Sequence, residues 1–234
     1  TLTTVFGTAG RLWAGGHDAV LLTSGDGGNT WTELYFDPER QQAIMDIHFS
    51  DELNGVAIGS YGLYLTTSDG GENWQDVVVD EESDYHLKRL LDLGDGKWLI
   101  AGEAGLSYRS NDAGQNWELM ELPYEGSMWG ALKSSDECVI FYGLRGHVLE
   151  SCNRGLSWAE VETASESSIS DAAVYDETVL LAANSGTLMI RDDSGQFNVY
   201  HHSSGVDFAA VYSMGDGSFL LVGEDGIHHY PEGK

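Results

Sequence analysis

The sequence predicts an all-β protein, a propeller built from four-stranded antiparallel blades. An eight-residue stretch ending in tryptophan recurs along the chain, and Trp31, Trp74, Trp117 and Trp158 follow one another at steps of 43, 43 and 41 residues. A fixed period of about 40 residues is typical of propellers and solenoids. Short apolar segments between Gly, Asn, Asp and Ser turns indicate strands. No segment sustains the 3.6-residue apolar period of a helix.

The recurring stretch has the chemistry of a turn that leads into a strand. Residues 24–31 read Ser-Gly-Asp-Gly-Gly-Asn-Thr-Trp. The Asp side chain can accept hydrogen bonds from the backbone that follows it, and the glycine two residues later supplies a positive φ. The Trp then offers a large apolar surface to a core. We expect a structural role, at the bottom outer corner of each blade, for Asp26, Trp31, Asp69, Trp74, Asp112, Trp117, Asn153, Trp158 and Asp193, the last three from degraded copies.

Six units follow one another, at about residues 1–37, 43–80, 86–122, 127–162, 168–201 and 206–231. Each of the first five reads as four strands. The sixth has three strands and no copy of the recurring stretch. Gly-rich hairpin turns that require positive φ are expected between second and third strands, as at residues 59–62 and 143–146. The pattern predicts one domain: either an open-edged six-blade ring, or a seven-blade ring whose first part is absent from this chain.

The charge balance excludes some partners. The chain has 11 Lys and Arg against 38 Asp and Glu, a net charge of −27. Nucleic acid is excluded because phosphate binding needs a basic patch, and an anionic membrane surface is disfavoured for the same reason. The acidity indicates solubility first, and an acidic surface for a basic partner second.

No apolar run reaches the roughly 18 residues of a membrane span, so we expect no direct membrane insertion. The chain opens on a strand pattern without a visible signal peptide, which leaves a missing leader or a cytosolic protein as alternatives.

Cys138 and Cys152 flank a predicted hairpin and could face each other across it. Two buried free thiols are favoured there, and a disulfide stays open.

The recurring stretch resembles the Asp-box, or bacterial neuraminidase repeat, of β-propellers. Residues 57–64, 101–105, 123–127 and 143–147 resemble the bacterial branch of the photosystem II stability/assembly factor-like family over essentially the whole chain. That resemblance implies an exported, periplasmic or secreted protein associated with membrane exporters, whose molecular activity is unassigned. The photosynthetic members carry an arginine-rich patch, whereas the seven arginines here are scattered, so a photosystem role is not expected.

Candidate binding residues gather on the face that carries the second-to-third-strand turns. Tyr and Trp in loops on a rigid scaffold are typical recognition anchors, and Arg89 and Arg145 are the candidate anion contacts. The alternative is that these residues merely plug the channel mouth. The predicted partner-binding set is Tyr61, Tyr85, Arg89, Glu103, Tyr124, Glu125, Trp129 and Arg145.

The sequence therefore favours a non-enzymatic, monomeric scaffold that binds a protein partner, such as a membrane transporter or complex. The alternative is a carbohydrate-binding or sialidase-related glycoside-hydrolase-like propeller, for which Glu103 and Glu125 are the carboxylate pair to test. No Arg is followed by the Ile/Leu-Pro of sialidases. No cofactor is predicted. Adjacent His pairs on a strand point to opposite faces, so no metal site is predicted either.

Overall fold

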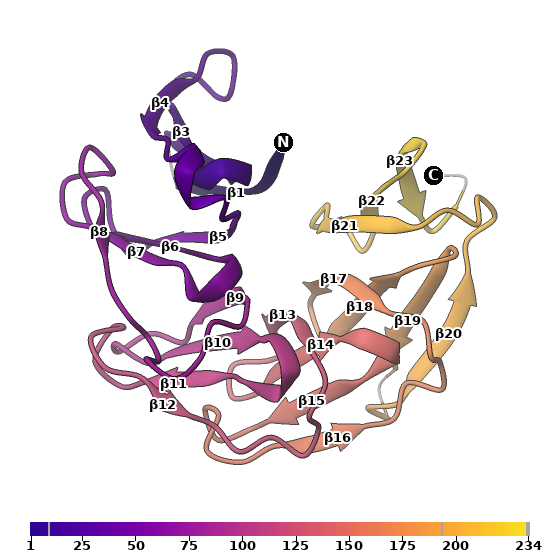
Figure 1. The fold of residues 1–234 in the computed structure, drawn as a ribbon. Coiled ribbons are helices and arrows are strands. Elements are labelled where there is room, and N and C mark those ends of the chain that lie inside the picture. The colour runs from indigo at the N-terminus through magenta and orange to yellow at the C-terminus, as the bar shows by residue number, and fades with distance from the viewer. Residues whose placement is uncertain (9, 193, 233–234) are drawn as a thin grey trace.

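The computed structural model describes residues 1–8, 10–192 and 194–232, and these residues form six antiparallel sheets around a common centre (Figure 1). The first five sheets have four strands each, in chain order, and the sixth has three. This confirms the predicted all-β propeller with its three-stranded last blade. Each apolar strand segment pairs with the next along the chain, so every blade is a simple meander.

The bounds of the strands are as follows. Blades 1 to 3 contain β1 (Leu2–Thr8), β2 (Arg11–Gly16), β3 (Leu21–Ser24), β4 (Thr32–Tyr35); β5 (Ile44–Phe49), β6 (Gly55–Gly59), β7 (Tyr64–Thr67), β8 (Gln75–Asp76); and β9 (Leu87–Asp92), β10 (Trp98–Gly102), β11 (Tyr108–Ser110), β12 (Glu118–Leu119). Blades 4 to 6 contain β13 (Met128–Lys133), β14 (Val139–Gly143), β15 (Val148–Ser151), β16 (Ala159–Val161); β17 (Ile169–Tyr175), β18 (Thr178–Ala183), β19 (Thr187–Arg191), β20 (Phe197–His201); and β21 (Phe208–Ser213), β22 (Phe219–Gly223), β23 (Gly226–Tyr230).

The first strand of each blade lies innermost, and each innermost strand packs beside that of the next blade. The turns between second and third strands all lie at one end of the ring, which we call the turn face. In four blades this turn is a three-residue 3-10 helix: η1 (His17–Ala19), η3 (Ser60–Gly62), η4 (Glu103–Gly105) and η5 (Leu144–Gly146). A fifth such helix, η2 (Pro38–Arg40), lies in the connection between blades 1 and 2. None of the described helices is long and apolar enough to cross a bilayer.

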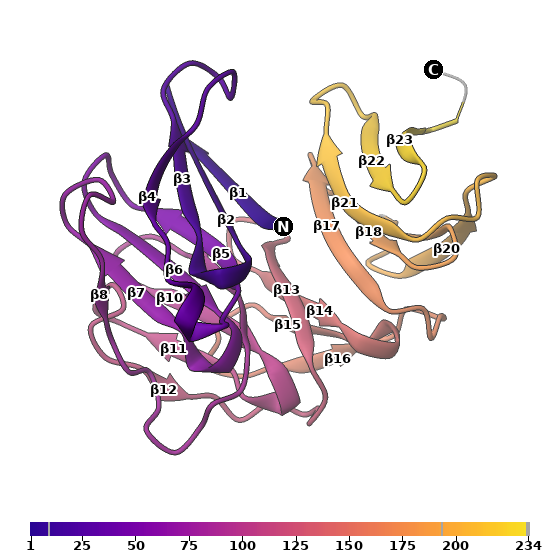
Figure 2. The ribbon, with the colours of Figure 1, turned by 45° about the horizontal axis from the view of Figure 1, so that its top comes forward.

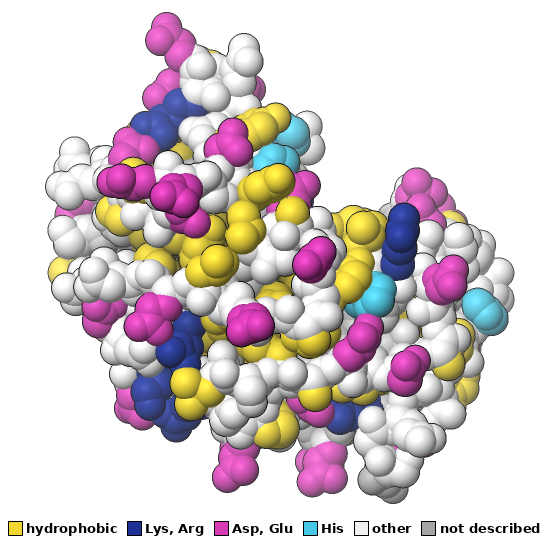
Figure 3. Space-filling model, turned by 60° about the horizontal axis from the view of Figure 1, so that its bottom comes forward, with side chains coloured by type: hydrophobic (Ala, Val, Ile, Leu, Met, Phe, Trp, Pro, Cys, Tyr) yellow, Lys and Arg dark blue, Asp and Glu magenta, His cyan; other side chains and the backbone are white. Residues whose placement is uncertain are grey.

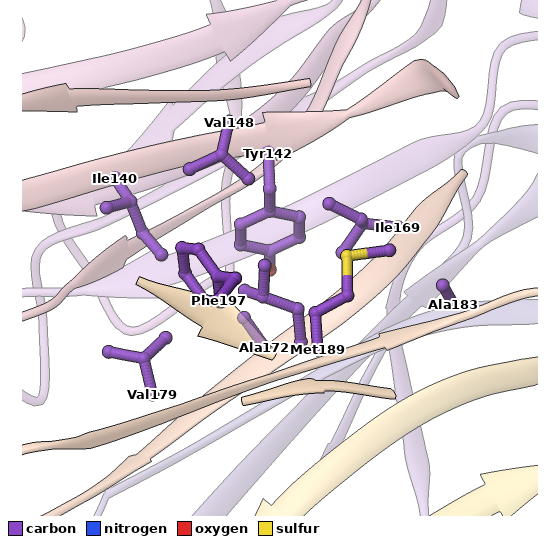
Figure 4. Close-up of a cluster of buried hydrophobic side chains, with 10 residues drawn as sticks. Ile140, Tyr142, Val148, Ile169, Ala172, Val179, Ala183, Met189 and Phe197 are labelled. Atoms are coloured by element: carbon purple, nitrogen blue, oxygen red, sulfur yellow. The ribbon is translucent and has the colours of Figure 1, made fainter. Parts of the chain in front are cut away.

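The hydrophobic core is divided into five clusters, one between each pair of successive blades. Between blades 4 and 5, for example, Tyr142, Ile169, Met189 and Phe197 point toward one another (Figure 4). Between blades 1 and 2, Trp13 is fully buried and stacks on Phe49 with 3.9 Å between ring centroids. Blades 2 to 5 thus have apolar side chains buried on both faces, and this burial holds the ring together.

The recurring turns are held by their carboxylates. In the first, Asp26 Oδ1 accepts the Thr30 backbone N–H at 2.9 Å and the Ser24 hydroxyl at 2.8 Å. A further hydrogen bond from the Thr30 hydroxyl is the main reason that the pKa of Asp26 falls to about 2. Asp69 and Asp112 accept the same pair of bonds.

The degraded copies keep this bonding in altered form. In the fourth turn Asn153 Oδ1 accepts the Ser157 N–H at 3.0 Å, so an amide replaces the carboxylate. In the fifth turn Asp192 accepts the Gln196 N–H at 3.2 Å. Asp193, the residue predicted for this turn from the repeat, lies outside the described residues.

The glycine of the third turn, Gly114, shows why this position is restricted. Its φ is +81°, a conformation that L side chains rarely adopt. An added Cβ would also lie 2.8 Å from the Trp98 ring and collide with the buried Tyr64 hydroxyl. The turn therefore packs directly on the preceding blade, as does the tryptophan that follows it: Trp117 lies edge-on to Tyr64 at 5.9 Å.

The ring is open between blades 1 and 6 (Figures 1 and 2). Trp74, Trp117 and Trp158 each pack into the cluster shared with the preceding blade, but Trp31 has no such neighbour and is 38% exposed. Val5 on blade 1 is 65% exposed, and Tyr212 on blade 6 is 69% exposed. The two blade faces beside the opening thus leave apolar side chains in solvent.

The two cysteines form a disulfide. Cys138 and Cys152 flank the paired residues Val139 and Ser151 on β14 and β15. The favoured expectation of two free thiols is therefore wrong, because both side chains lie on the same side of the hairpin. The Glu150 carboxylate lies within 4.8 Å of both sulfurs, but sulfurs joined to each other do not offer the thiolates that a metal would need.

Candidate binding site at the channel mouth

The innermost strands share a β-bulge near the turn face. In all six, the pairing with the second strand skips one residue close to the strand's start. A bulge re-aims the side chains around it. In five of the six strands the skipped residue and the next one both line the central channel, and in β5 only the skipped residue does. The skipped residues are Thr3, Met45, Lys88, Trp129, Ser170 and Ala209.

These strands surround a cavity of about 510 Å³. The bulged residues lie opposite the residues that lead into the second-to-third-strand turns, such as Gly59 and Gly143, so the cavity opens at the turn face. It also extends toward the opening in the ring, where Leu2, Val5 and Trp31 of blade 1 contribute to its lining. The channel is thus accessible both from the turn face and beside blade 1.

A charged network fixes the channel wall. Asp46 is buried and accepts the Leu90 N–H at 2.8 Å, and its Oδ1 lies 3.4 Å from Arg89 Nη1. Burial raises the pKa of Asp46, and the Arg89 guanidinium opposes that rise. Arg89 itself remains 46% exposed to the channel. Because Asp46 bonds to the next blade's innermost strand, it also ties blade 2 to blade 3.

Asp171 on β17 repeats this arrangement three blades further along. Its Oδ2 accepts the Val211 N–H at 2.9 Å and its Oδ1 accepts the Tyr142 hydroxyl at 3.2 Å. Burial raises the pKa of Asp171. Tyr142 reaches this position over Gly130, where any added Cβ would collide with the phenol ring.

Lys88 differs from the other cations of the site. Its side chain is half-buried beside Arg89, and burial lowers its pKa while Glu103 acts in the opposite direction. Among the residues that the structure describes, no hydrogen bond or ion pair of the Lys88 ammonium is found. In contrast, Arg40, Arg109 and Arg191 are all paired with acids. One face of the molecule shows acids spread widely and basic side chains in few places (Figure 3).

Of the eight predicted binding residues, two lie in the channel. Trp129 lines the cavity together with Arg89. Arg89, the predicted anion contact, is directed by its bulged strand into the channel, where one of its terminal nitrogens approaches Asp46. Sequence reasoning missed Lys88, Asp46, Asp171 and Tyr142, since nothing in an unaligned sequence marks a bulge.

Three more predicted residues lie on the turn face, on the blade 2 to blade 3 side. Tyr61 lies at the tip of η3, is 58% exposed, and meets the His86 ring edge-on at 4.9 Å. Tyr85 is exposed in the connection between the blades, where its carbonyl accepts the Gly62 N–H. Glu103 is half-buried and accepts the His86 backbone N–H at 3.3 Å.

Of the remaining three, Tyr124 and Glu125 lie between blades 3 and 4, and Arg145 lies on the blade 4 to blade 5 side. Arg145 is exposed at the tip of η5, and its backbone N–H donates to the Ser168 hydroxyl. Tyr124 is half-buried and stacks on His147 at 3.8 Å, and His147 in turn lies 2.5 Å from Glu160. Glu125 is exposed beside η4. The hypothesis of a Glu103–Glu125 hydrolytic pair thus has one member already engaged by backbone.

The tips of the turns carry side chains in an unusual backbone conformation. Tyr61 and Arg145 have φ of 55° and 57°. This suits the hairpin turn, which needs positive φ at two positions, but Asn, Asp or Gly are the residues normally found there. A bulky residue costs about 1 kcal/mol or more in this region. Both side chains face solvent, so burial does not offset that cost.

Comparison with known proteins identifies the family of this chain. The family model described as photosynthesis system II assembly factor YCF48 matches residues 35–216, well over half of the chain. The chain belongs to this family. A search of the curated proteins finds no match.

Solved YCF48 structures share the fold. A structure described as YCF48 bound to D1 peptide superposes with a TM-score of 0.80 at 19% identity, covering 98% of this chain and 78% of that one. YCF48 from Cyanidioschyzon merolae gives a TM-score of 0.71 at 16% identity, covering 94% and 79%. Virginiamycin B lyase from Staphylococcus aureus, an enzyme, gives 0.79 at 12% identity, covering 100% and 85%. At these identities the likeness establishes the fold alone.

Proposed function

We propose that this chain is a non-enzymatic, monomeric scaffold that binds a protein partner on its turn face, at the mouth of the channel. The observation that carries the proposal is that Tyr61, Tyr85 and Arg145 are exposed beside the turns of the face onto which a cavity containing Trp129 opens. Aromatic and arginine side chains dominate the binding energy of protein interfaces. Here they stand on turns fixed by a rigid β-scaffold, which limits the ordering cost of binding.

Membership of the YCF48 family supports a protein partner, because one solved member is described as bound to a D1 peptide. On the same family membership, we propose that the partner belongs to a membrane complex or is a transporter. An exported, periplasmic or secreted location is consistent with the Cys138–Cys152 disulfide, since disulfides persist in oxidising compartments.

The test is affinity capture from the native cell envelope, with wild type compared with the Tyr61→Ala/Arg145→Ala double variant. Both substitutions are on exposed tips, and replacing residues there should leave the fold intact. As a matched control, Leu156→Ala removes an exposed side chain from a recurring turn outside the turn face. We expect one envelope protein to be retained by wild type and the control and lost by the double variant. Equal retention by all three would refute a turn-face site.

A carbohydrate-binding function is the alternative, and the aromatic Trp129 in the cavity is the observation that favours it. Tyr85 does not line that cavity, and the carboxylate that does, Asp171, is occupied by Val211 and Tyr142. A glycan array with wild type and Trp129→Ala tests this function. Binding of a glycan that is lost in Trp129→Ala would move it ahead of the scaffold.

A further inference from the structure

The channel mouth of this strongly acidic protein contains a half-buried lysine, Lys88, on whose charge Glu103 acts without a hydrogen bond or ion pair between the two being found among the described residues. The chain carries 38 acidic residues and 11 Lys and Arg, yet the half-buried ammonium of Lys88 has no hydrogen bond or ion pair with any described residue. A partly buried charge without a hydrogen-bonded partner is unfavourable. Burial lowers the pKa of Lys88, and the charge of Glu103 opposes this only in part. An anion bound beside it would remove the cost.

Arg89 strengthens the attraction for an anion at the same place. The two cations are consecutive in the sequence, and the bulge in β9 allows both to line the cavity. Asp46 approaches one terminal nitrogen of Arg89 at 3.4 Å, and the guanidinium still has donors to offer because it carries five N–H groups. Nearby Asp171 directs its two oxygens to Val211 and Tyr142, so both oxygens already accept a hydrogen bond.

Apolar surface adjoins these cations. Trp129 is the bulged residue of the neighbouring blade 4 and is partly exposed. On the side of the ring opening, Val5 and Trp31 continue the cavity wall with exposed apolar side chains. A ligand that fits must therefore present one anionic group with an apolar group next to it.

We propose that the channel mouth binds a peptide carboxylate with Lys88 and Arg89 while the adjacent apolar side chain of the same peptide packs on Trp129. This rests on the proposed function and specifies the partner as an extended segment that carries an acidic side chain or a free C-terminus beside an apolar residue. A single carboxylate suits two cations in an otherwise acidic surface, where a polyanion would be repelled.

The probes are short acetylated peptides of sequence Gly-Leu-Phe. One ends in a free carboxylate and one in an amide. A second pair ends in Glu-amide or Gln-amide, so that terminal and side-chain carboxylates are tested separately. Binding is followed through the Trp129 indole N–H signal in two-dimensional NMR, assigned with Trp129→Phe. Peptide up to about 10 mM detects complexes with dissociation constants near 1 mM.

The key variant is Lys88→Gln, and the matched control is Lys133→Gln, an exposed lysine at the other end of an innermost strand. A hydrogen bond to a charged group is worth enough that its loss weakens binding roughly tenfold or more. We expect at least one carboxylate peptide to bind wild type and Lys133→Gln alike, and to bind Lys88→Gln roughly tenfold more weakly. The matching amide peptide should bind wild type at least as weakly as the carboxylate peptide binds Lys88→Gln.

Three outcomes would overturn the proposal: amides that bind as well as carboxylates, equal binding by Lys88→Gln and wild type, or no shift of the Trp129 signal with any peptide. The envelope capture separates this from the broader function. A partner that is retained by Lys88→Gln but lost by Tyr61→Ala/Arg145→Ala would leave the scaffold function standing and remove the carboxylate site.

Discussion

Asp46 should stabilise the ring through a hydrogen bond between blades rather than through its charge. Its carboxylate accepts the buried Leu90 N–H at 2.8 Å, and its pKa is raised because burial disfavours the charged form. Asp46→Ala leaves that N–H without an acceptor, which costs about 1–3 kcal/mol. For a chain of this length, that corresponds to a fall in melting temperature of roughly 2–12 °C.

Asp46→Asn separates the two contributions. The Asn carbonyl still accepts the Leu90 N–H, and the cost of burying a charge is removed. Arg89 loses its counter-ion, but its guanidinium is 46% exposed and stays hydrated. We therefore expect the free energy of unfolding of Asp46→Asn to stay within about 1 kcal/mol of wild type.

The assay is urea and thermal unfolding, with hydrogen exchange at the Leu90 amide as a local readout. Asp136→Ala is the matched control, since Asp136 is exposed and has no positive φ, and this substitution should change stability by no more than about 0.5 kcal/mol. If Asn costs as much as Ala, the charge on Asp46 is what matters and the reasoning is refuted. If neither substitution has an effect, the blades are held together without this bond.

Three other predictions concern the turns and the disulfide. Gly114→Ala should destabilise the fold by about 2–4 kcal/mol in urea unfolding, because strain and overpacking combine there; Gly27→Ala, with positive φ but open space, should cost only about 1–2 kcal/mol, and equal losses would contradict the packing argument. Reducing the Cys138–Cys152 disulfide should lower the free energy of unfolding by about 3 kcal/mol, as expected for a loop of this length, whereas a Cys138→Ser/Cys152→Ser variant should not respond to reductant. Stability should fall as pH drops from about 4 to about 2, because the recurring-turn carboxylates with pKa values of about 2 have lower pKa values folded than unfolded and lose their stabilising bonds on protonation; an unfolding free energy that is flat over this range, measured by urea titration, would count against it.

The fold was predictable because every unit repeats the same local chemistry. The turn of Asp26 has its hydrogen bonds within eight residues, so sequence spacing suffices to place it. The outer strands are less predictable: each of the first five units is expected to end in a fourth strand after its recurring stretch, but in the third unit β12 covers Glu118–Leu119 only. An outer strand pairs on one side, so little holds it in regular pairing beyond the turn that precedes it.

The candidate site was predictable only in part, because it depends on contacts between blades. Tyr61 and Arg145 could be placed on the turn face from the hairpin pattern. Lys88 and Arg89 could not be placed in the channel, because strand alternation assigns consecutive residues to opposite faces and the bulge breaks that rule. Asp46 is likewise bonded to a residue 44 positions away, a distance that no local pattern reports.

The most direct test of the account is where the partner touches the protein. A photoreactive amino acid placed at Tyr61, at the rim of the channel mouth, is compared with the same group at Leu156, exposed outside the turn face. After irradiation in the native cell envelope, the account predicts one protein crosslinked from position 61 and absent from position 156. Crosslinks from position 156 alone, or the same products from both positions, would contradict a binding site at the channel mouth.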